Sequence, residues 1–408
     1  MNKTIYRKFA KLAVQVGIGL KKGQPVIITA STAASGFAVC VAEECYRRGA
    51  SKVTVDWINE SVQKLAYLNQ TLETLSHVPL WQEEKEKEKV SLLPCTIWID
   101  DDDPNAFDGV DIDKMMSANQ ARAKVLKKYR EQRDNKYQWT IISIPSKKWA
   151  AKVFPNEKPS AAVKKLWQHI LSATRLDCTD PVNNWKNHIS LLKIKAKILN
   201  ELNFDSLHYK SKNGTDLTVG LHPWHLWSCA GGKTVSGNEY VANMPSEEVF
   251  TVPSKKRVDG VVYSSKPLSY NGVLIEDFNI TFKNGKAVDC DARVGKEMLE
   301  SLLKMDDGAS RLGEVALVPY DSPVSNLNTL FYNTLFDENA SCHLALGFGI
   351  TDAIKGYETM EKADFDRIGV NDSIIHVDFM IGNSDLEITG TSKDGQTVRI
   401  FKNGNWAI

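Results

Sequence analysis

Three apolar segments in the last third of this 408-residue chain carry ionisable side chains. Glu314 lies in Arg-Leu-Gly-Glu-Val-Ala-Leu-Val-Pro, and His343 lies in Ala-Ser-Cys-His-Leu-Ala-Leu-Gly. His376 and Asp378 lie in His-Val-Asp-Phe-Met-Ile-Gly. An ionised group in apolar surroundings is costly unless a partner or a metal compensates it. Any fold of this chain must therefore supply these groups with such partners.

The segment around His376 has the simplest predicted geometry. Residues 374–381 are rich in β-branched and aromatic side chains and end at Gly382, which predicts a strand. Residues two apart on a strand face the same side, so His376 and Asp378 should project together. An imidazole beside a carboxylate suits a divalent metal such as zinc, manganese or cobalt. A hydrogen-bonded His–Asp pair explains the same pattern, so this pair alone leaves both interpretations open.

Length and composition limit the class of protein. A chain of 408 residues exceeds the size at which one core keeps growing, which predicts two domains. A net charge of +1 argues against a nucleic-acid-binding surface, and no stretch has the roughly 18 apolar residues of a membrane span. Seven scattered cysteines without a Cys-x-x-Cys pattern favour reduced thiols in the cytoplasm.

The first half of the chain alternates between strand and helix patterns. Residues 24–30 and 51–57 are predicted strands that flank a predicted helix at residues 35–48. Residues 96–99 and 139–145 have the composition of further strands. Such β-α-β alternation implies a parallel sheet covered by helices.

The second half has a different pattern. A long predicted helix at residues 182–202 is followed by short strands and Asn-Gly turns such as Asn213-Gly214. We therefore predict an α/β N-terminal domain with a parallel sheet, residues 1–201. A β-rich α+β C-terminal domain, residues 202–408, would carry the metal site.

Two further polar groupings have a structural explanation as well as a functional one. The four carboxylates at residues 100–103 follow a strand and could bind a cation or a substrate ammonium group. Pro104-Asn105 follows them directly, which favours a solvated turn. His222 and His225 lie three residues apart, but Pro223 between them argues against a helix that presents both to a metal.

Adjacent carboxylates at Glu247 and Glu248 follow Pro245 and precede an apolar run. They could mark the start of a helix, where the dipole favours acidic side chains. They could instead share a task, with one carboxylate on a metal and its neighbour moving protons.

Several long stretches, in the same order, resemble the thermophilic-type metalloaminopeptidases, the family of the aminopeptidase T and aminopeptidase S type. They are Asn-Met-Pro-Ser-Glu-Glu-Val-Phe-Thr, Gly-Glu-Val-Ala-Leu-Val-Pro, Leu-Phe-Tyr-Asn-Thr-Leu-Phe-Asp-Glu-Asn-Ala-Ser-Cys-His-Leu-Ala-Leu-Gly and His-Val-Asp-Phe-Met-Ile-Gly. Weaker similarity runs through most of the chain. The resemblance implies an N-terminal α/β domain joined to a β-rich domain, and homodimers whose enclosed cavity admits small peptides.

The resemblance also implies a site with two divalent metal ions that releases N-terminal amino acids from peptides. Glu314 would be the carboxylate shared between the ions. A mixed set of imidazoles and carboxylates suits zinc, cobalt or manganese. The metal ligands of the family fall on these residues of the chain: Glu248, Glu314, His343, His376 and Asp378.

Glu247 is our candidate for the general base, because it is adjacent to the expected ligand Glu248. Asp321 is a candidate for binding the substrate α-ammonium group. One position departs from the family, since Ile350 stands where members with a tyrosine near the metals carry it. Only a rearranged loop would let Tyr357 replace that tyrosine.

Two other functions are compatible with this pattern. The iron-dependent 2,5-dihydroxypyridine dioxygenases are similar in sequence and hold one metal with two histidines and an acid. A non-catalytic peptide-binding relative is the second alternative, because Ile350 removes a hydrogen-bonding side chain from the site. Two histidines with three acids favour two metals over one.

Overall fold

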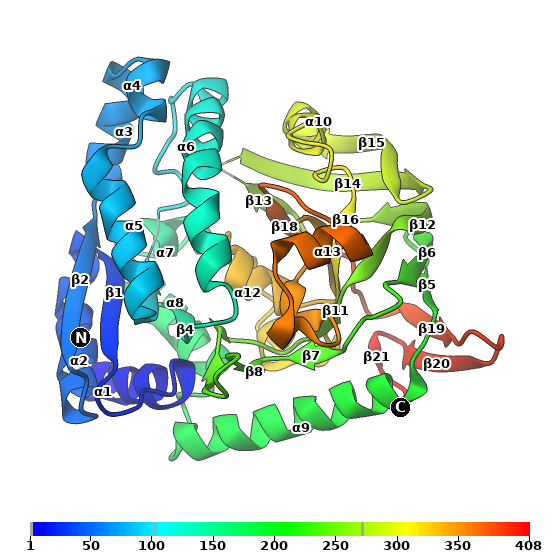
Figure 1. Ribbon diagram of the computed structural model, residues 1–408, viewed down its shortest axis with the longest axis horizontal. Helices are drawn as coiled ribbons and strands as arrows, with labels where there is room; N and C mark the ends of the chain where they lie inside the picture. Colours follow the sequence, from blue (N-terminus) through cyan, green and yellow to red (C-terminus); the bar gives the residue numbers. More distant parts are fainter. Residues whose placement is uncertain (1–2, 102, 271–272) are drawn as a thin grey trace. The chain divides into compact units, whose positions relative to one another are not determined.

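The computed structural model describes residues 3–101, 103–270 and 273–408. The chain forms two compact units, shown with their elements in Figure 1. The first unit contains Met1–His188 and Gly231–Met244, and the second contains Ile189–Ala230 and Pro245–Ile408. The long helix α9 (Pro181–Leu202) belongs partly to each unit.

The first unit is built on a five-stranded sheet in the order β10-β4-β3-β1-β2. Every neighbouring pair in this sheet is parallel. Apolar side chains at alternate positions of the central strands are fully buried, so one face of the sheet is packed more deeply than the other. The strands are β1 (Pro25–Ser31), β2 (Lys52–Ile58), β3 (Cys95–Asp100), β4 (Trp139–Ser143) and β10 (Asn243–Met244).

Helices connect these strands, and α5 and α6 run side by side (Figure 1). A small hairpin of β8 (Gly231–Lys233) and β9 (Glu239–Val241) also belongs to this unit. The helices are α1 (Lys3–Leu12), η1 (Ala13–Gly17), η2 (Thr32–Ala34), α2 (Ser35–Arg47), α3 (Glu60–Asn69), α4 (Leu72–Ser76), α5 (Leu80–Leu92), α6 (Ile112–Arg133), α7 (Lys147–Val153) and α8 (Pro159–Ala173).

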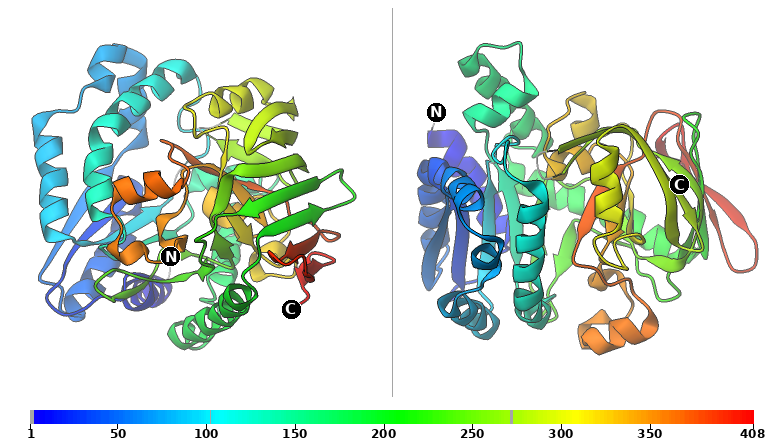
Figure 2. Two further views of the ribbon diagram at one scale, coloured as in Figure 1. Left: turned by 45° about the vertical axis from the view of Figure 1, so that its right-hand side comes forward. Right: turned by 90° about the horizontal axis from the view of Figure 1, so that it is seen from above.

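The second unit contains two antiparallel sheets. The larger has the order β13-β14-β12-β6-β5-β19-β20-β21, with β15 paired to β14, and Figure 2 shows its long strands lying side by side. Its strands are β5 (Ser206–Lys210), β6 (Asp216–Leu221), β12 (Pro253–Tyr263), β13 (Leu268–Tyr270), β14 (Val273–Lys283), β15 (Lys286–Val294), β19 (Glu387–Thr391), β20 (Thr397–Lys402) and β21 (Asn405–Trp406).

The smaller sheet, in the order β18-β17-β16-β11-β7, carries the candidate site. Its strands are β7 (Ser228–Cys229), β11 (Val249–Thr251), β16 (Leu312–Leu317), β17 (His343–Gly347) and β18 (His376–Met380). The remaining helices are α10 (Lys296–Leu303), α11 (Pro323–Asn326), α12 (Thr334–Glu338), η3 (Thr351–Ala353), η4 (Tyr357–Thr359) and α13 (Lys362–Ile368).

These sheets confirm the predicted fold class, an α/β N-terminal region with a parallel sheet and a β-rich C-terminal region. The alternative that Glu247 and Glu248 begin a helix is wrong. Both residues lie in an irregular segment that leads directly into strand β11. The apolar run after Glu248 is β-branched and aromatic, and in β11 it pairs on both sides, with β7 and β16.

Candidate metal centre

The register of strands β16, β17 and β18 places four of the expected ligands on one face of the smaller sheet. Ala345 of β17 lies opposite both Glu314 and Asp378 on the neighbouring strands. His376 lies opposite Gly347, two residues beyond Ala345. Cross-strand partners share a face, and so do residues two apart on a strand. His343, at the start of β17, lies two residues before Ala345 and therefore faces the same side.

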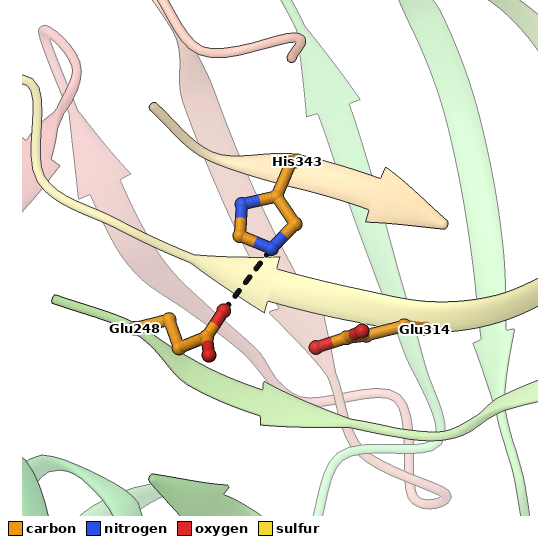
Figure 3. Close-up of side chains that lie close together, drawn as sticks. All are labelled: Glu248, Glu314 and His343. Carbon is orange, nitrogen blue, oxygen red and sulfur yellow. Dashed lines mark ion pairs between the residues drawn. The ribbon is translucent and has the colours of Figure 1, made fainter. Parts of the chain in front are cut away.

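Glu248 reaches the same face from the adjacent strand. Phe250 of β11 pairs with Ala316, which lies two residues after Glu314 and so faces the same side. Glu248 lies two residues before Phe250, so it faces that side as well if β11 is extended by one residue. Figure 3 shows Glu248, Glu314 and His343 converging from neighbouring segments. The ligand atoms of these three residues lie within 4.8 Å of one another.

Glu314 belongs to a second group of the same kind. Its carboxylate, the His376 imidazole and the Asp378 carboxylate also have ligand atoms within 4.8 Å of one another. The structure therefore brings all five expected ligands together, in two groups of three that share Glu314. This is the arrangement that a carboxylate between two cations requires.

Both imidazoles are oriented by backbone carbonyls. His343 Nδ1 donates to the carbonyl oxygens of Glu338 and Ser341, at 3.0 and 3.1 Å, and His376 Nδ1 donates to that of Phe348 at 2.8 Å. Each Nε2 then faces the carboxylates: His343 Nε2 lies 3.1 Å from Glu248 Oε2, and His376 Nε2 lies 3.0 Å from Glu314 Oε2. This is how metal-binding histidines are commonly held, with one nitrogen on a fixed acceptor and the other free to bind.

Small residues keep the face of the sheet open between the ligands. Ala316 and Ala345 are buried and have no side-chain atoms beyond Cβ. Gly347 has φ +105, and a Cβ there would lie 2.2 Å from the Ile375 carbonyl oxygen. A larger side chain at Gly347 would therefore displace the strand that carries His376.

Burial and mutual proximity shift the pKa values of the clustered groups. Burial raises the pKa of Glu314 to about 7, although the hydrogen bond from His376 opposes the shift. Burial alone would lower the pKa of His343, but the hydrogen bond and charge of Glu248 raise it to about 10. A divalent cation that binds Glu314 and His343 would therefore compete with protons on these two groups.

The metal-stripped protein is expected to lose stability as the pH rises. Folding raises the pKa of Glu314 from 4.5 to about 7. The stability that this group contributes is therefore lost as the pH rises across that interval. The contribution of His343 is fully present below its unfolded pKa of 6.5 and is lost as the pH rises through about 10. Thermal unfolding of chelator-treated protein from pH 5 to 10 measures this. Metal-loaded protein should not show the decline, and a stripped protein more stable at pH 9 than at pH 6 would contradict it.

Glu247 is buried and is tied to the loop that precedes His343. Its backbone N–H donates to Asn339 Oδ1 at 2.8 Å, and Asn339 Nδ2 donates to the Leu335 carbonyl oxygen at 2.8 Å. Asn339 is itself fully buried. The position of Glu247 is therefore fixed by the same segment, residues 333–347, that supplies a ligand.

Glu338 is a buried carboxylate at this site that the sequence did not single out. Its side chain hydrogen-bonds to Asp378, and Asn339 Nδ2 lies 3.3 Å from Glu338 Oε1. Burial, followed by the charges of Asp378 and Glu248, raises the pKa of Glu338 well above its usual range. A protonated Glu338 donates to Asp378 and so orients that carboxylate. The available signal was an acid five residues before His343, within a stretch that resembles the family.

The other residues singled out from the sequence lie outside both groups of three. Asp321 is exposed and accepts a hydrogen bond from Asn326 Nδ2 at 2.8 Å. His222 and His225 bond to backbone carbonyl oxygens and belong to neither group found among the described residues. Ile350 packs against an apolar cluster that Tyr357 also contacts.

The donor set fits divalent cations. Three carboxylates and two imidazoles gathered at a largely buried position need compensating positive charge. Cys342 adjoins His343 in sequence, but its Sγ donates to the Val318 carbonyl oxygen at 3.2 Å. Nitrogen and oxygen donors without a thiolate suit borderline metals rather than a structural zinc site.

Comparison with known proteins agrees with this geometry. A family model described as thermophilic metalloprotease (M29) matches residues 2–406. The aminopeptidase AmpS of Bacillus subtilis is 44% identical over 401 residues, and aminopeptidase 2 of Geobacillus stearothermophilus is 40% identical over 402. The alignments cover 98% of this chain, and 98% and 97% of those proteins. The solved structure of wild-type AmpT from Thermus thermophilus has a TM-score of 0.91 and 37% identity, and all of both chains is covered.

Fold and site thus define the class, a metallo-aminopeptidase. The chain belongs to the thermophilic metalloprotease family M29. This confirms the family resemblance seen in the sequence and does not favour the dioxygenase alternative. None of the helices in the described part of the chain is long and apolar enough to cross a membrane.

Proposed function

We propose that the protein releases N-terminal amino acids from small peptides at a centre of two divalent metal ions, zinc, cobalt or manganese. The observation that carries this proposal is the sharing of Glu314 by two groups of three ligand residues. A single-metal site would need only one such group. The proposed ligands are Glu248, Glu314 and His343 for one ion, and Glu314, His376 and Asp378 for the other.

Two cations at this position would polarise the peptide carbonyl and lower the pKa of the attacking water. The protein's own groups provide the rest of the chemistry. Glu247 is proposed to accept a proton from the water at a carboxylate oxygen and to deliver it to the nitrogen of the leaving amine. Glu338 orients Asp378, and the backbone carbonyls that bind Nδ1 hold the two imidazoles with Nε2 toward the carboxylates.

The activity is tested by removing the metal with a chelator and adding back zinc, cobalt or manganese. A leucyl peptide and its N-acetylated twin serve as substrates, since only the first has a free α-ammonium group. We expect at least one of the metals to restore release of leucine from the free peptide and none to restore release from the acetylated one. Cleavage of both peptides would indicate an endopeptidase, and oxygen consumption with one iron per chain would indicate a dioxygenase.

We further propose that residues 202–408 form the metal-binding catalytic domain and that the protein acts as a homodimer in the cytoplasm. All five proposed ligands and Glu247 lie within these residues. The seven cysteines are free, which is compatible with a reducing compartment. Light scattering coupled to size-exclusion chromatography measures the oligomeric state, and a monomeric mass would contradict the dimer.

A further inference from the structure

A second polar site lies in the first unit, where three neighbouring strands of the parallel sheet end. Ser31 ends β1, Asp100 ends β3 and is followed by Asp101, and Ser143 ends β4. In the sheet, β2 lies on one side of β1 and β3 lies on its other side, so the strand order reverses between β1 and β3. In open parallel sheets, ligands bind beyond the carboxyl ends of the strands at such a reversal.

Two buried carboxylates occupy this position. Asp101 Oδ2 accepts a hydrogen bond from Ser31 Oγ at 2.7 Å, and Asp100 Oδ2 accepts one from Ser143 Oγ at 3.4 Å. Asp101 is 6% exposed and Asp100 is 9% exposed. The expectation of a solvated turn is therefore wrong for these two residues, because both carboxylates face hydroxyl groups on the neighbouring strands. Asp102 lies outside the described residues.

One oxygen of this pair is left without a partner. Asp101 Oδ1 is buried and accepts no hydrogen bond from any of the described residues. A buried, unpaired carboxylate oxygen is costly, and in native proteins it usually marks a water or an ion. Burial accordingly raises the pKa of Asp101, and the charge of Asp100 adds to the shift although the Ser31 hydrogen bond opposes it.

Nearby basic groups do not satisfy this oxygen. Lys148 Nζ lies 2.9 Å from Asp103 Oδ2 and so neutralises a different carboxylate of the same segment. Glu60 accepts a hydrogen bond from the backbone N–H of Asp103, which adds a further negative charge close by. The local balance therefore remains negative around Asp101.

We propose that the ends of β1, β3 and β4 bind a hard divalent cation of the Mg²⁺ type, with Asp101 Oδ1 as its ligand. The Ser31 hydroxyl holds the other oxygen of this carboxylate, and Asp100 and Ser143 form the adjacent hydrogen-bonded pair at the ends of β3 and β4. Mg²⁺ commonly binds through one or two carboxylates and retains several waters, and an oxygen-only donor set selects it over zinc. This site has no imidazole and belongs to residues of the first unit, unlike the centre built around Glu314.

The test uses the full chain with its aminopeptidase centre saturated with zinc, and Mg²⁺ as the probe in calorimetry and thermal unfolding. We expect one additional Mg²⁺ per chain and a higher unfolding temperature. Asp101→Asn should weaken this binding at least tenfold. Asp108→Asn, which removes an exposed carboxylate of the same segment, should leave it unchanged. Ser31→Ala keeps both charges and should weaken binding severalfold, so it decides the question if Asp101→Asn does not fold.

The same titration on a Glu314→Gln variant separates this proposal from the proposed function, because Mg²⁺ binding at Asp101 should persist there. No saturable Mg²⁺ binding to the zinc-loaded wild type would overturn the proposal and assign a buried water to Asp101. Equal binding by wild type and Asp101→Asn would overturn it as well, since the ion would then lie elsewhere.

Discussion

Replacement of Glu314 by glutamine is expected to lower kcat/KM for a leucyl peptide by about 10³-fold or more and to reduce the metal content. Glu314 is the one residue common to both groups of ligand atoms, so its loss affects both proposed ions. Metal-assisted polarisation of a carbonyl contributes several kcal/mol, and about 4 kcal/mol corresponds to 10³-fold in rate. Metal analysis of the purified variant and steady-state kinetics measure the two effects.

Glu358→Gln is the matched control for this variant. Glu358 is an exposed glutamate of the same unit, so both metal content and turnover should remain at the wild-type level. A Glu314→Gln protein that keeps two metals and near-normal turnover would remove the basis of the two-metal proposal.

Glu247→Gln is expected to lower kcat by about 10² to 10⁴-fold while both metals remain bound, since general acid–base catalysis contributes an effect of this size. Glutamine keeps the shape of the side chain and the backbone hydrogen bond to Asn339. Folding should therefore be unaffected, and KM should change far less than kcat.

A purely structural role for Glu247 would give a different result. Loss of packing would lower the unfolding temperature and would reduce the metal content along with the turnover. Near-normal turnover with both metals present would end the assignment of Glu247 as the base, and one of the other buried acids, Glu338 above all, would have to be examined in its place.

Local patterns were sufficient for the elements that carry the site. The β-branched and aromatic residues of the segment 374–381 predicted a strand with His376 and Asp378 on one face. Strand β18 confirms this geometry, with His376 Nε2 lying 3.4 Å from Asp378 Oδ1. The parallel sheet was likewise predicted from β-α-β alternation, because short strand-forming segments there alternate with helical ones. The metal-binding roles of the five residues rest on the family resemblance and remain predictions.

Features that depend on distant partners could not be predicted in this way. Asn243 pairs with Ile141 across about a hundred residues of sequence, and no periodicity within residues 231–244 marks them as part of the first unit. Asp101 is buried and accepts a hydrogen bond from Ser31 of another strand. Glu338 adjoins Asp378 only through the tertiary fold. Each of these contacts joins residues that are far apart in the sequence, and the residues next to each one do not indicate its partner.

The backbone carbonyls that hold the two imidazoles have a consequence for how a metal would enter this site. Ring orientation is set by the main chain of residues 338, 341 and 348, so the cradle is complete once the chain has folded. One ion can then replace another without refolding, and protons are the competitors that each must displace. Affinity among first-row metals follows a common order in sites of this kind, so geometry, ligand type and metal supply together would select the ion. The metal found in the purified protein would then depend on the metals in the growth medium as well as on the site.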